Sequence, residues 1–597
     1  MTTRLTICFL TLAGTYAWAA GGPATRPALE AADYGQLILA NDNVAVWWCE
    51  AMRKVGRTRP APREGAAAAS LSAAKNEFEA VQIVVRPDKP LAALRCRATD
   101  LEGPNGSRIP AGNISLLRVA YVPVTAPTDS LGQAGDWPDP LPPLDGPIDV
   151  PAGVNQPIWV LVHVPRDAAA SDYLGRIELS ANGWSAHVPI SLHVWDFALP
   201  DKPRTASALG LSMGNAYRYQ AAKTSEQHRQ LFAKYMQCFA DHRISPYNPV
   251  PFDPIDIKFV PDAQPPRADV TFDRFDAAMA EAIDRWHITS FNLHLPGMGG
   301  GTFHQRHEGQ IADFKAGSPQ FEALFSSMVR QIESHLRDKG WLDLAYVYWF
   351  DEPEPRDYEF VRAGMDRIKK YAPGIRRMLT EQPTEPLFGA VDLWCPILDA
   401  FKPDEVRRRQ ALGEQFWWYI CTGPKAPYCT EFIDHPATSL RAWLWQTWQH
   451  QVSGILIWET TYWTSGTAFP DSLQDPYRDA MSYVSGYGTP AGTKKPWGNG
   501  DGRFIYPPES AAEGATHFVP DGPVSSIRWE MLRDGIEDLD YCYLLTDAHA
   551  ARGNKDSRID APADISARLT SYTFDPAPIY RQRQRVAEMI ERIVRER

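Results

Sequence analysis

Two patterns of apolar and polar residues divide the chain near residue 200. Between residues 75 and 199, short segments alternate apolar with polar positions, and proline, glycine and asparagine turns separate them. A period of two is typical of strands with one buried face, so this part predicts an antiparallel β-sandwich. The clearest predicted strands are Glu79–Val85, Ile158–Val164 and Ala186–Val194.

Two proline-containing segments interrupt this pattern. Residues 136–144 carry four prolines, and because proline removes a backbone donor, we expect a long surface loop there and no strand. Leu199–Pro203 has the composition of a linker.

After residue 200, short apolar segments alternate with amphipathic helices, which is the pattern of a parallel sheet with crossover helices. No glycine-rich phosphate-binding fingerprint accompanies them, so we predict a (β/α)8 TIM-like barrel. The predicted strands are Ala206–Leu211, Ser290–His294, Ala345–Phe350, Arg377–Thr380, Val391–Pro396, Gln415–Ile420, Gly454–Glu459 and Arg503–Tyr506. The predicted helices are Ser225–His242, Asp273–Trp286, Gln320–Lys339, Tyr358–Tyr371 and Ile527–Leu545. The predicted domains are therefore a β-sandwich over residues 20–200 and a catalytic barrel with C-terminal helices over 201–597.

The first 19 residues have the pattern of a bacterial export signal. Arg4 precedes an apolar run that ends at Trp18, and Ala17-Trp18-Ala19 matches a small-x-small cleavage site. We expect residues 1–19 to be removed and the mature chain to be periplasmic or secreted. No later apolar stretch approaches the roughly 18 residues of a membrane span, so we expect no membrane insertion.

Charge and aromatic content indicate which kind of ligand the chain binds. The chain has 61 Lys and Arg against 72 Asp and Glu, a net charge of −11, and no basic stripe, which argues against nucleic acid. Many of the aromatic residues stand beside polar ones. Such positions suit sugars, whose C–H faces stack on rings while their hydroxyls need polar partners, although most of the rings are expected to belong to the core.

The cysteines are too few to form a disulfide scaffold. Seven of the eight follow residue 19, an odd number in a long chain. Cys421 and Cys429 bracket a turn-like segment, and both a disulfide and two buried thiols are compatible with that spacing.

The strongest chemical signal is an apolar strand that ends in acids. Asp351 and Glu352 follow six mostly aromatic or apolar residues, and Pro353 and Pro355 prevent the strand from continuing. Reactive residues of a barrel lie where its strands end. From spacing alone, a catalytic role and a structural role in capping the next helix both remain open.

Strand geometry narrows the chemistry of this pair. Neighbouring residues on a strand point to opposite sides, so Asp351 and Glu352 are badly placed to face each other across one glycosidic bond as nucleophile and acid. They can instead contact different parts of one substrate, Glu352 the leaving oxygen and Asp351 a group on the far side of the sugar. A 2-acetamido group that attacks its own anomeric carbon would then supply the nucleophile.

Other side chains are candidates for the walls of a sugar site. Trp417, Trp418 and Tyr419 end one predicted strand, and Trp458 and Trp463 end or follow the next. We expect about half of them to contact substrate and their alternating neighbours to belong to the core. A sixth candidate is the side chain of His294, for which a hydrogen bond to a sugar hydroxyl and a structural hydrogen bond are equally compatible.

The sequence lacks the motifs of several other kinds of functional site. His304 and His307 have no third ligand at metal spacing and His-Glu-x-x-His is absent, so we expect no metal and no cofactor. The esterase and nucleotide-binding motifs are absent as well. The charged residues Arg533, Asp534, Glu537 and Asp538 share one predicted helix, where salt bridges within the helix are favoured over a functional role.

Seven segments together resemble glycoside hydrolase family 123 and the uncharacterised bacterial domain family associated with it. They span nearly all of the mature chain, and the last two are the most specific: Lys75–Glu79, Asp136–Leu141, Gly340–Pro353, Trp418–Cys421, Gly454–Trp458 with Trp463, Gly498–Pro507 and Arg528–Asp538. The resemblance implies a retaining exo-β-N-acetylgalactosaminidase that uses substrate assistance. It places the family's Asp-Glu pair on Asp351 and Glu352, with Asp351 orienting the acetamido N–H and Glu352 acting as general acid and then base.

The sequence thus predicts a secreted glycoside hydrolase that removes terminal β-linked N-acetylgalactosamine from a glycan or glycoconjugate. Two alternatives remain open: the same fold with another sugar specificity, and a carbohydrate-binding protein without turnover. An intact Asp351-Glu352 pair argues against the second, because a lectin needs no acid beside a glycosidic oxygen. The oligomeric state is not predicted.

Overall fold

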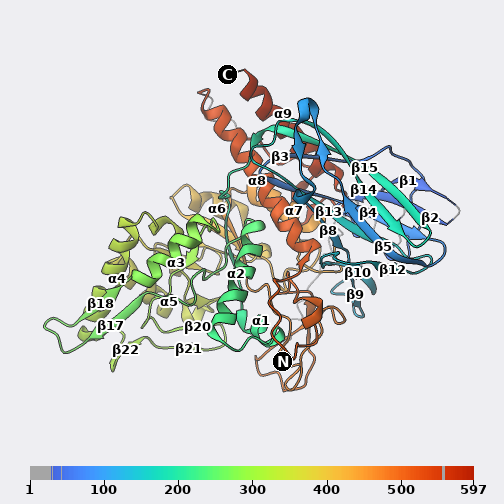
Figure 1. Cartoon of the computed structure of the whole chain (residues 1–597). Coiled ribbons are helices and arrows are strands. Elements are labelled where there is room, and N and C mark those ends of the chain that lie inside the picture. Colours follow the sequence, from blue (N-terminus) through green and yellow to red (C-terminus); the bar gives the residue numbers. More distant parts are fainter. Residues whose placement is uncertain (1–28, 30, 32, 42, 554–557, 597) are drawn as a thin grey trace, which may run out of the picture.

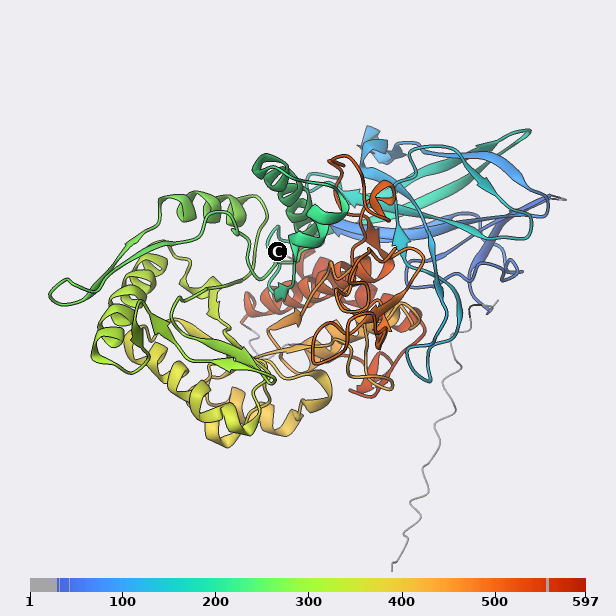
Figure 2. The same ribbon diagram turned by 90° about the horizontal axis from the view of Figure 1, so that it is seen from below.

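The computed structural model describes residues 29, 31, 33–41, 43–553 and 558–596. The predicted export signal, residues 1–19, lies outside the described residues. The chain forms an N-terminal β-domain and a C-terminal helical and parallel-strand domain that lie side by side (Figures 1 and 2).

Two facing sheets make up the N-terminal domain. The strands of the first, in spatial order, are β1 (Gln36–Ala40), β2 (Val44–Glu50), β4 (Glu77–Pro87), β13 (Gln156–Val164) and β8 (Ile114–Arg118). Those of the second are β12 (Ile148–Val150), β5 (Leu91–Ala98), β14 (Ser171–Ala181), β15 (Trp184–Ala198) and β3 (Ala69–Lys75), with β6 (Leu101–Glu102) and β7 (Arg108–Ile109) at one side. One core of Val, Ile and Leu side chains from both sheets lies between them. Among the described strands of these two sheets, every pair is antiparallel apart from β3 with β15, which run parallel.

The proline-rich segment expected to be a surface loop is largely buried instead. It forms β10 (Gly135–Pro138), which pairs with β9 (Tyr121–Val124), and β11 (Pro140–Leu141), which pairs with β32 (Ser525–Ser526) of the C-terminal domain. Trp137 and Asp139 are both buried there, and Asp139 accepts hydrogen bonds from Arg528 and Tyr506. Proline limits strand length but does not prevent a short pair, and these apolar residues contact the neighbouring domain.

Seven parallel strands form a nearly closed ring in the C-terminal domain. In spatial order they are β16 (Ala206–Leu209), β29 (Gly454–Ile457), β28 (Gln415–Tyr419), β27 (Leu393–Trp394), β26 (Arg376–Leu379), β24 (Ala345–Val347) and β19 (Phe291–Asn292). Residues 245–247 fill the gap between the two ends, since the N–H of Tyr247 bonds to Leu209 and its carbonyl accepts from Asn292. The predicted eighth strand, Arg503–Tyr506, is not part of the ring. Its residues form only isolated antiparallel bridges, so the exact eightfold pattern was wrong at this position.

Helices follow most of the ring strands along the chain, as the sequence pattern predicts, and Figure 1 labels them. The five predicted helices appear as α2 (Ser225–Asp241), α3 (Asp273–Asp284), α4 (Pro319–Asp338), α5 (Tyr358–Tyr371) and α8 (Ile527–Ala550). Four further helices are α1 (Met213–Tyr219), α6 (Pro403–Gln410), α7 (Thr438–Gln449) and α9 (Ala577–Arg595). None of the helices in the described part of the chain is long and apolar enough to cross a membrane.

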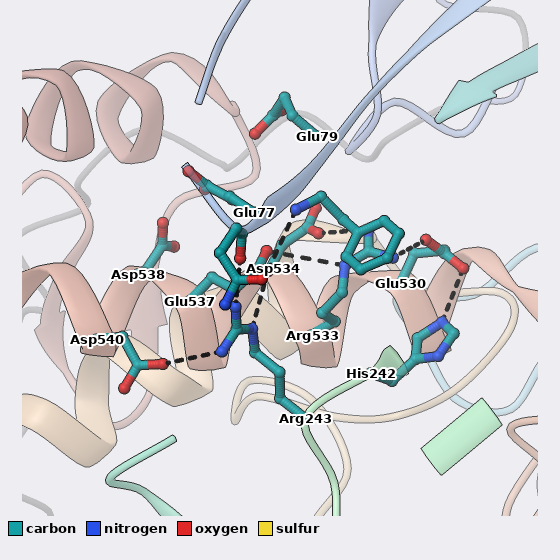
Figure 3. A network of polar contacts seen from close by, with 12 residues as sticks. Glu77, Glu79, His242, Arg243, Glu530, Arg533, Asp534, Glu537, Asp538 and Asp540 are labelled. Atoms are coloured by element: carbon teal, nitrogen blue, oxygen red, sulfur yellow. Dashed lines mark hydrogen bonds and ion pairs between the residues drawn. The ribbon is translucent and has the colours of Figure 1, made fainter. Parts of the chain in front are cut away.

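A buried network of charges on α8 connects the two domains (Figure 3). From the barrel, Arg243 donates to Glu537 at 3.0 Å and to the carbonyl of Asn76 at 2.6 Å. From α9, the guanidinium of Arg583 pairs with Glu77 and Glu79 of β4. The salt bridges predicted within this helix are present in part, since Arg533 pairs with Asp534 and Glu537, but these residues are buried and the acids also pair with residues of other elements. The remaining members of the network are His242, Arg441, Glu530, Asp538 and Asp540.

Candidate active site

A cavity of about 650 Å³ opens at the carboxyl ends of the barrel strands. Asp351 and Glu352 line it, as do Tyr419 and Trp458, so four of the eight predicted site residues meet in one place. The other lining residues are Tyr247, Asn292, Gly301, Phe303, Tyr348, Trp349, Phe350, Thr380, Cys421, Thr422, Leu456, Tyr487, Trp497 and Asp501.

The backbone at the acidic pair explains how two neighbouring carboxyl groups share this cavity. β24 is followed by the short strand β25 (Phe350–Asp351), which pairs with β20 (Gly300–Thr302). Glu352 then adopts a left-handed conformation with φ of 43°. Non-glycine residues seldom adopt this region, and strained positions cluster at functional sites. The alternation of side chains that a regular strand imposes ends here, so both carboxyl groups line the cavity.

Hydrogen bonds anchor Asp351 from two neighbouring strand ends. The hydroxyl of Tyr348 donates to Asp351 Oδ1 at 2.5 Å, and the hydroxyl of Thr380 donates to the same oxygen at 3.0 Å. Thr380 also accepts from the backbone N–H of Glu352 at 2.9 Å. Both bonds to the carboxylate use Oδ1, and within the described residues no partner is found for Oδ2. Asp351 is therefore fixed in orientation while one oxygen stays available to accept from a ligand.

The surroundings of Glu352 favour its protonated form. Burial raises the pKa of this carboxyl, and the nearby charge of Asp351 raises it further. The hydroxyl of Tyr419 donates to Glu352 Oε1, which stabilises the carboxylate and partly offsets the rise. A carboxyl group with a raised pKa in a cavity is suited to donate a proton near neutral pH.

Aromatic side chains form the rest of the wall. Trp458 is half-buried at the end of β29, and its ring lies 5.6 Å from that of Trp497. At the outer end of the cavity, Tyr487 is 50% exposed and its ring lies 5.8 Å from that of Phe303. Rings with one free face beside carboxyl and hydroxyl groups are the surroundings that a sugar requires.

Four predicted wall residues lie elsewhere. Trp417 points into the buried interior of the barrel, next to Tyr346, and Trp418 points outward to the helices, where its indole donates to Thr447 at 3.0 Å. Trp463 is buried and donates to the carbonyl of Ile505 at 2.7 Å. His294 is exposed and does not line the cavity. Being at a strand end is not sufficient, because alternate side chains belong to the core.

Three lining residues that the sequence analysis did not single out have a recognisable signal. Thr380 ends a predicted strand just as Asp351 does, and Tyr348 lies three residues before Asp351 in the same run. Asp501 belongs to the Gly498–Pro507 segment, one of the two most specific motifs. Thr380 and Tyr348 can be identified from the sequence as polar residues near the ends of neighbouring predicted strands.

The described residues contain no group of three or more His, Cys, Asp or Glu side chains arranged to hold a metal ion. Cys421 and Cys429 are both free thiols in the structure, and Cys429 is buried. The cavity is lined by carboxyl groups, hydroxyls and aromatic rings.

A carboxyl pair in an aromatic-lined cavity, at the carboxyl ends of parallel barrel strands, is the arrangement of a glycoside hydrolase. Comparison with protein families agrees. Residues 272–545 match the glycoside hydrolase 123 catalytic domain, and residues 51–181 match the glycoside hydrolase 123 N-terminal domain. The chain belongs to glycoside hydrolase family 123, as the resemblance predicted.

One solved structure supports the same fold. A family 123 glycoside hydrolase from Clostridium perfringens superimposes with a TM-score of 0.61 and 17% identity, over 88% of this chain and 94% of that one. A β-glucuronidase from Parabacteroides merdae (TM-score 0.22, 8% identity, 64% and 44% of the two chains) and a GH10 xylanase from termite gut (0.25, 9%, 64% and 89%) are too distant to bear on the argument. No curated protein matches the chain.

Proposed function

We propose that this glycoside hydrolase removes terminal β-linked N-acetylgalactosamine with retention of configuration, and that the 2-acetamido group of the substrate is the nucleophile. The observation that carries the proposal is the adjacency of Asp351 and Glu352 in one cavity. Retaining enzymes with two protein carboxylates hold them about 5–5.5 Å apart on opposite sides of the scissile bond. Two consecutive residues are not placed in this way, so we assign them different roles on one substrate.

In the proposed first step, Oδ2 of Asp351 accepts the acetamido N–H and orients the amide oxygen towards the anomeric carbon. That oxygen forms a bond to the carbon while the glycosidic C–O bond breaks, and Glu352 transfers its proton to the departing oxygen. The anchoring of Asp351 by Tyr348 and Thr380 supports this role, since a fixed acceptor gives the amide one orientation.

In the proposed second step, the carboxylate of Glu352 removes a proton from water. The water oxygen attacks the anomeric carbon, the bond to the amide oxygen breaks, and the acetamido group is restored. Glu352 regains its proton and the sugar leaves with its original configuration. The burial of Glu352 supports a group that alternates between acid and base.

We also propose that the enzyme acts outside the cytoplasm, in the periplasm or as a secreted protein. This rests on the export pattern of residues 1–19. Fractionation of cells that express the full chain, followed by N-terminal sequencing of the mature protein, tests it. A protein that retains Met1 and stays in the cytoplasm would refute it.

The test of the activity is a panel of chromogenic glycosides with β-GalNAc, β-GlcNAc and β-galactose. We expect β-GalNAc to be hydrolysed with the highest kcat/KM. β-Galactose, which lacks the acetamido nucleophile, should not be hydrolysed, and Asp351→Asn serves as the inactive control. A thiazoline mimic of the bicyclic intermediate should inhibit more strongly than free GalNAc. Hydrolysis of β-galactose, or trapping of a covalent glycosyl-enzyme, would overturn the mechanism.

A further inference from the structure

A second pair of acids lies behind the wall of the cavity. Asp501, which lines the cavity next to Trp458, and Glu431, which precedes α7, are both fully buried. Asp501 Oδ1 accepts a hydrogen bond from the indole N–H of Trp458 at 3.1 Å. Glu431 Oε1 accepts from the backbone N–H of Gly502 at 3.2 Å. Each acid therefore uses one carboxyl oxygen to hold a part of the wall.

The other oxygen of each acid has no hydrogen-bond partner. In the described part of the chain, Glu431 Oε2 and Asp501 Oδ2 are both buried and unpartnered. Burial raises the pKa of Glu431, and the charge of Asp501 raises it further. Because two buried carboxylates repel each other, the pair is most stable with one proton and a single negative charge.

The charged and titratable neighbours come from three elements. Lys425, from the loop after β28, donates to the carbonyl of Trp497 at 2.9 Å, and Arg528 on α8 donates to the carbonyls of Glu431 and Gly500. Cys421 and Tyr462 also face the pair. Neither Lys425 nor Arg528 donates a hydrogen bond to the carboxyl group of Glu431 or Asp501. Their positive charges therefore stabilise the ionised acids only in part. Burial outweighs it and raises the pKa of Glu431 well above its usual range, while Asp501 accepts from Trp458 and faces Lys425. We therefore assign the proton of the pair to Glu431.

The indole of Trp458 is restrained on several sides. A Cβ atom at Gly502, where φ is +66°, would lie 2.4 Å from Cζ2 of Trp458, so the backbone at this glycine lies directly against the ring. The rings of Tyr462 and Trp497 lie 5.0 and 5.6 Å from it. Glu431 holds Gly502 and Asp501 holds the indole N–H, so the two acids fix the backbone and the ring together.

We propose that Asp501 and Glu431 are positioning residues that hold Trp458 as a stacking platform for the sugar. This rests on the proposed carbohydrate substrate but does not require that the sugar is GalNAc. A sugar gains stacking energy only from a ring at a defined angle, so a platform fixed before binding spares the cost of ordering it. Ionisation of Glu431 would place a second charge beside Asp501, and the repulsion would release Trp458.

The first experiment is a double-mutant cycle between Asp501 and Trp458. Asp501→Ala leaves the indole N–H without an acceptor in a buried place, and we expect KM to rise about 10-fold while kcat changes less. In a Trp458→Phe background, which has no indole N–H, the same substitution should change KM by less than about 2-fold, because Asp501 has no ring N–H to hold there. An equal rise in both backgrounds would mean that Asp501 acts through the fold in general and would overturn the proposal.

The second experiment uses Glu431→Gln, since an amide is neutral like the protonated acid but has no titratable proton. The wild-type KM should rise as pH increases into the alkaline range, and in this variant the rise should disappear. Lys425 still titrates in both proteins, so a rise that survives in Glu431→Gln belongs to another group and contradicts the proposal. Glu333→Gln, which alters a buried carboxylate of α4 outside the cavity, is the control and should keep the wild-type profile.

These measurements separate the positioning role from the proposed activity. They use whichever glycoside of the panel is hydrolysed, and sugar binding can be followed by tryptophan fluorescence in the Asp351→Asn protein. If β-GalNAc is not a substrate, the proposed specificity fails while the cycle between Asp501 and Trp458 still has its expected outcome. If Asp501→Ala does not fold, the pH profile of Glu431→Gln decides the question alone.

Discussion

The hydroxyl of Tyr419, at the end of β28, donates a hydrogen bond to Oε1 of Glu352, which follows β25. One donor from a separate strand thus adjusts the protonation of the proposed general acid. Tyr419→Phe removes this stabilisation of the carboxylate, and the pKa of Glu352 should rise.

The basic limb of the kcat/KM profile reports the acid that must be protonated in the free enzyme. We therefore expect this limb to move to higher pH in Tyr419→Phe, measured with the glycoside that wild type hydrolyses best. Tyr173→Phe, which removes a hydroxyl bonded to the carbonyl of Ala169 in the N-terminal domain, is the matched control. A limb that stays in place in Tyr419→Phe would show that Glu352 does not set it.

Substitutions of the two carboxyl groups should reduce activity in different ways. Glu352→Gln loses general acid help, worth on the order of 10²–10⁴-fold, on a natural glycan, but keeps more of its first-step rate on a nitrophenyl glycoside whose leaving group needs little protonation. Asp351→Asn should be impaired on both, because the nucleophile is the same whatever departs. The measurement is kcat/KM of each variant on both substrates. If the ratio of the loss on the natural glycan to the loss on the nitrophenyl glycoside is the same in both variants, the roles are wrongly assigned.

Removal of an indole distinguishes the wall from the core. Trp418 is fully buried, and Trp418→Ala should cost about 3–5 kcal/mol of stability, seen as a lower melting temperature. Trp458→Ala removes a half-buried cavity ring, so KM should rise while the melting temperature falls less. Unchanged kinetics in Trp458→Ala would exclude this ring from the substrate site.

The charge network on α8 gives stability a defined dependence on pH. Burial raises the pKa of Asp540 from 3.8 to about 7. Between these two pH values the folded chain binds protons that the unfolded chain has released, so this contribution to stability is fully present below pH 3.8 and is lost as pH rises towards 7. The melting temperature should decrease over this range on account of Asp540.

Asp540→Asn removes one of these protons, so its melting temperature should depend less on pH between about 4 and 7 than that of wild type. Asp547→Asn, on the same helix but at an exposed position, is the control and should follow the wild-type curve. Parallel curves for wild type and Asp540→Asn would contradict the assignment.

The sequence pattern predicted the order of strands and helices well because the apolar face of each element is local information. Tyr358–Tyr371 shows this, since its predicted bounds are those of α5. The pattern failed where packing is not periodic: α7 is buried on all sides and shows no polar face, and the ring is completed by residues 245–247, which form no regular strand. These features depend on neighbours that lie far away in the chain.

The candidate site was predictable in part for the same reason. Asp351 and Glu352 stand out as acids after an apolar run, whereas the left-handed backbone at Glu352, which brings both into one cavity, has no counterpart in composition. Trp417 and Trp418 show the reverse case. Their position at a strand end suggested a wall, but the direction of each side chain is set by the register of β28 between β27 and β29.

The ion pairs of Arg583 with Glu77 and Glu79 connect residues that are about 500 positions apart. The ribosome synthesises the N-terminal sheets long before it reaches α9. Glu77 and Glu79 of β4 therefore remain without Arg583 until the end of synthesis. Contacts of such long range slow folding and leave partly folded states exposed to aggregation. The N-terminal domain therefore reaches its native electrostatic state only when translation is almost complete, and a transcript truncated before α9 would yield a chain with two uncompensated acids at its domain boundary.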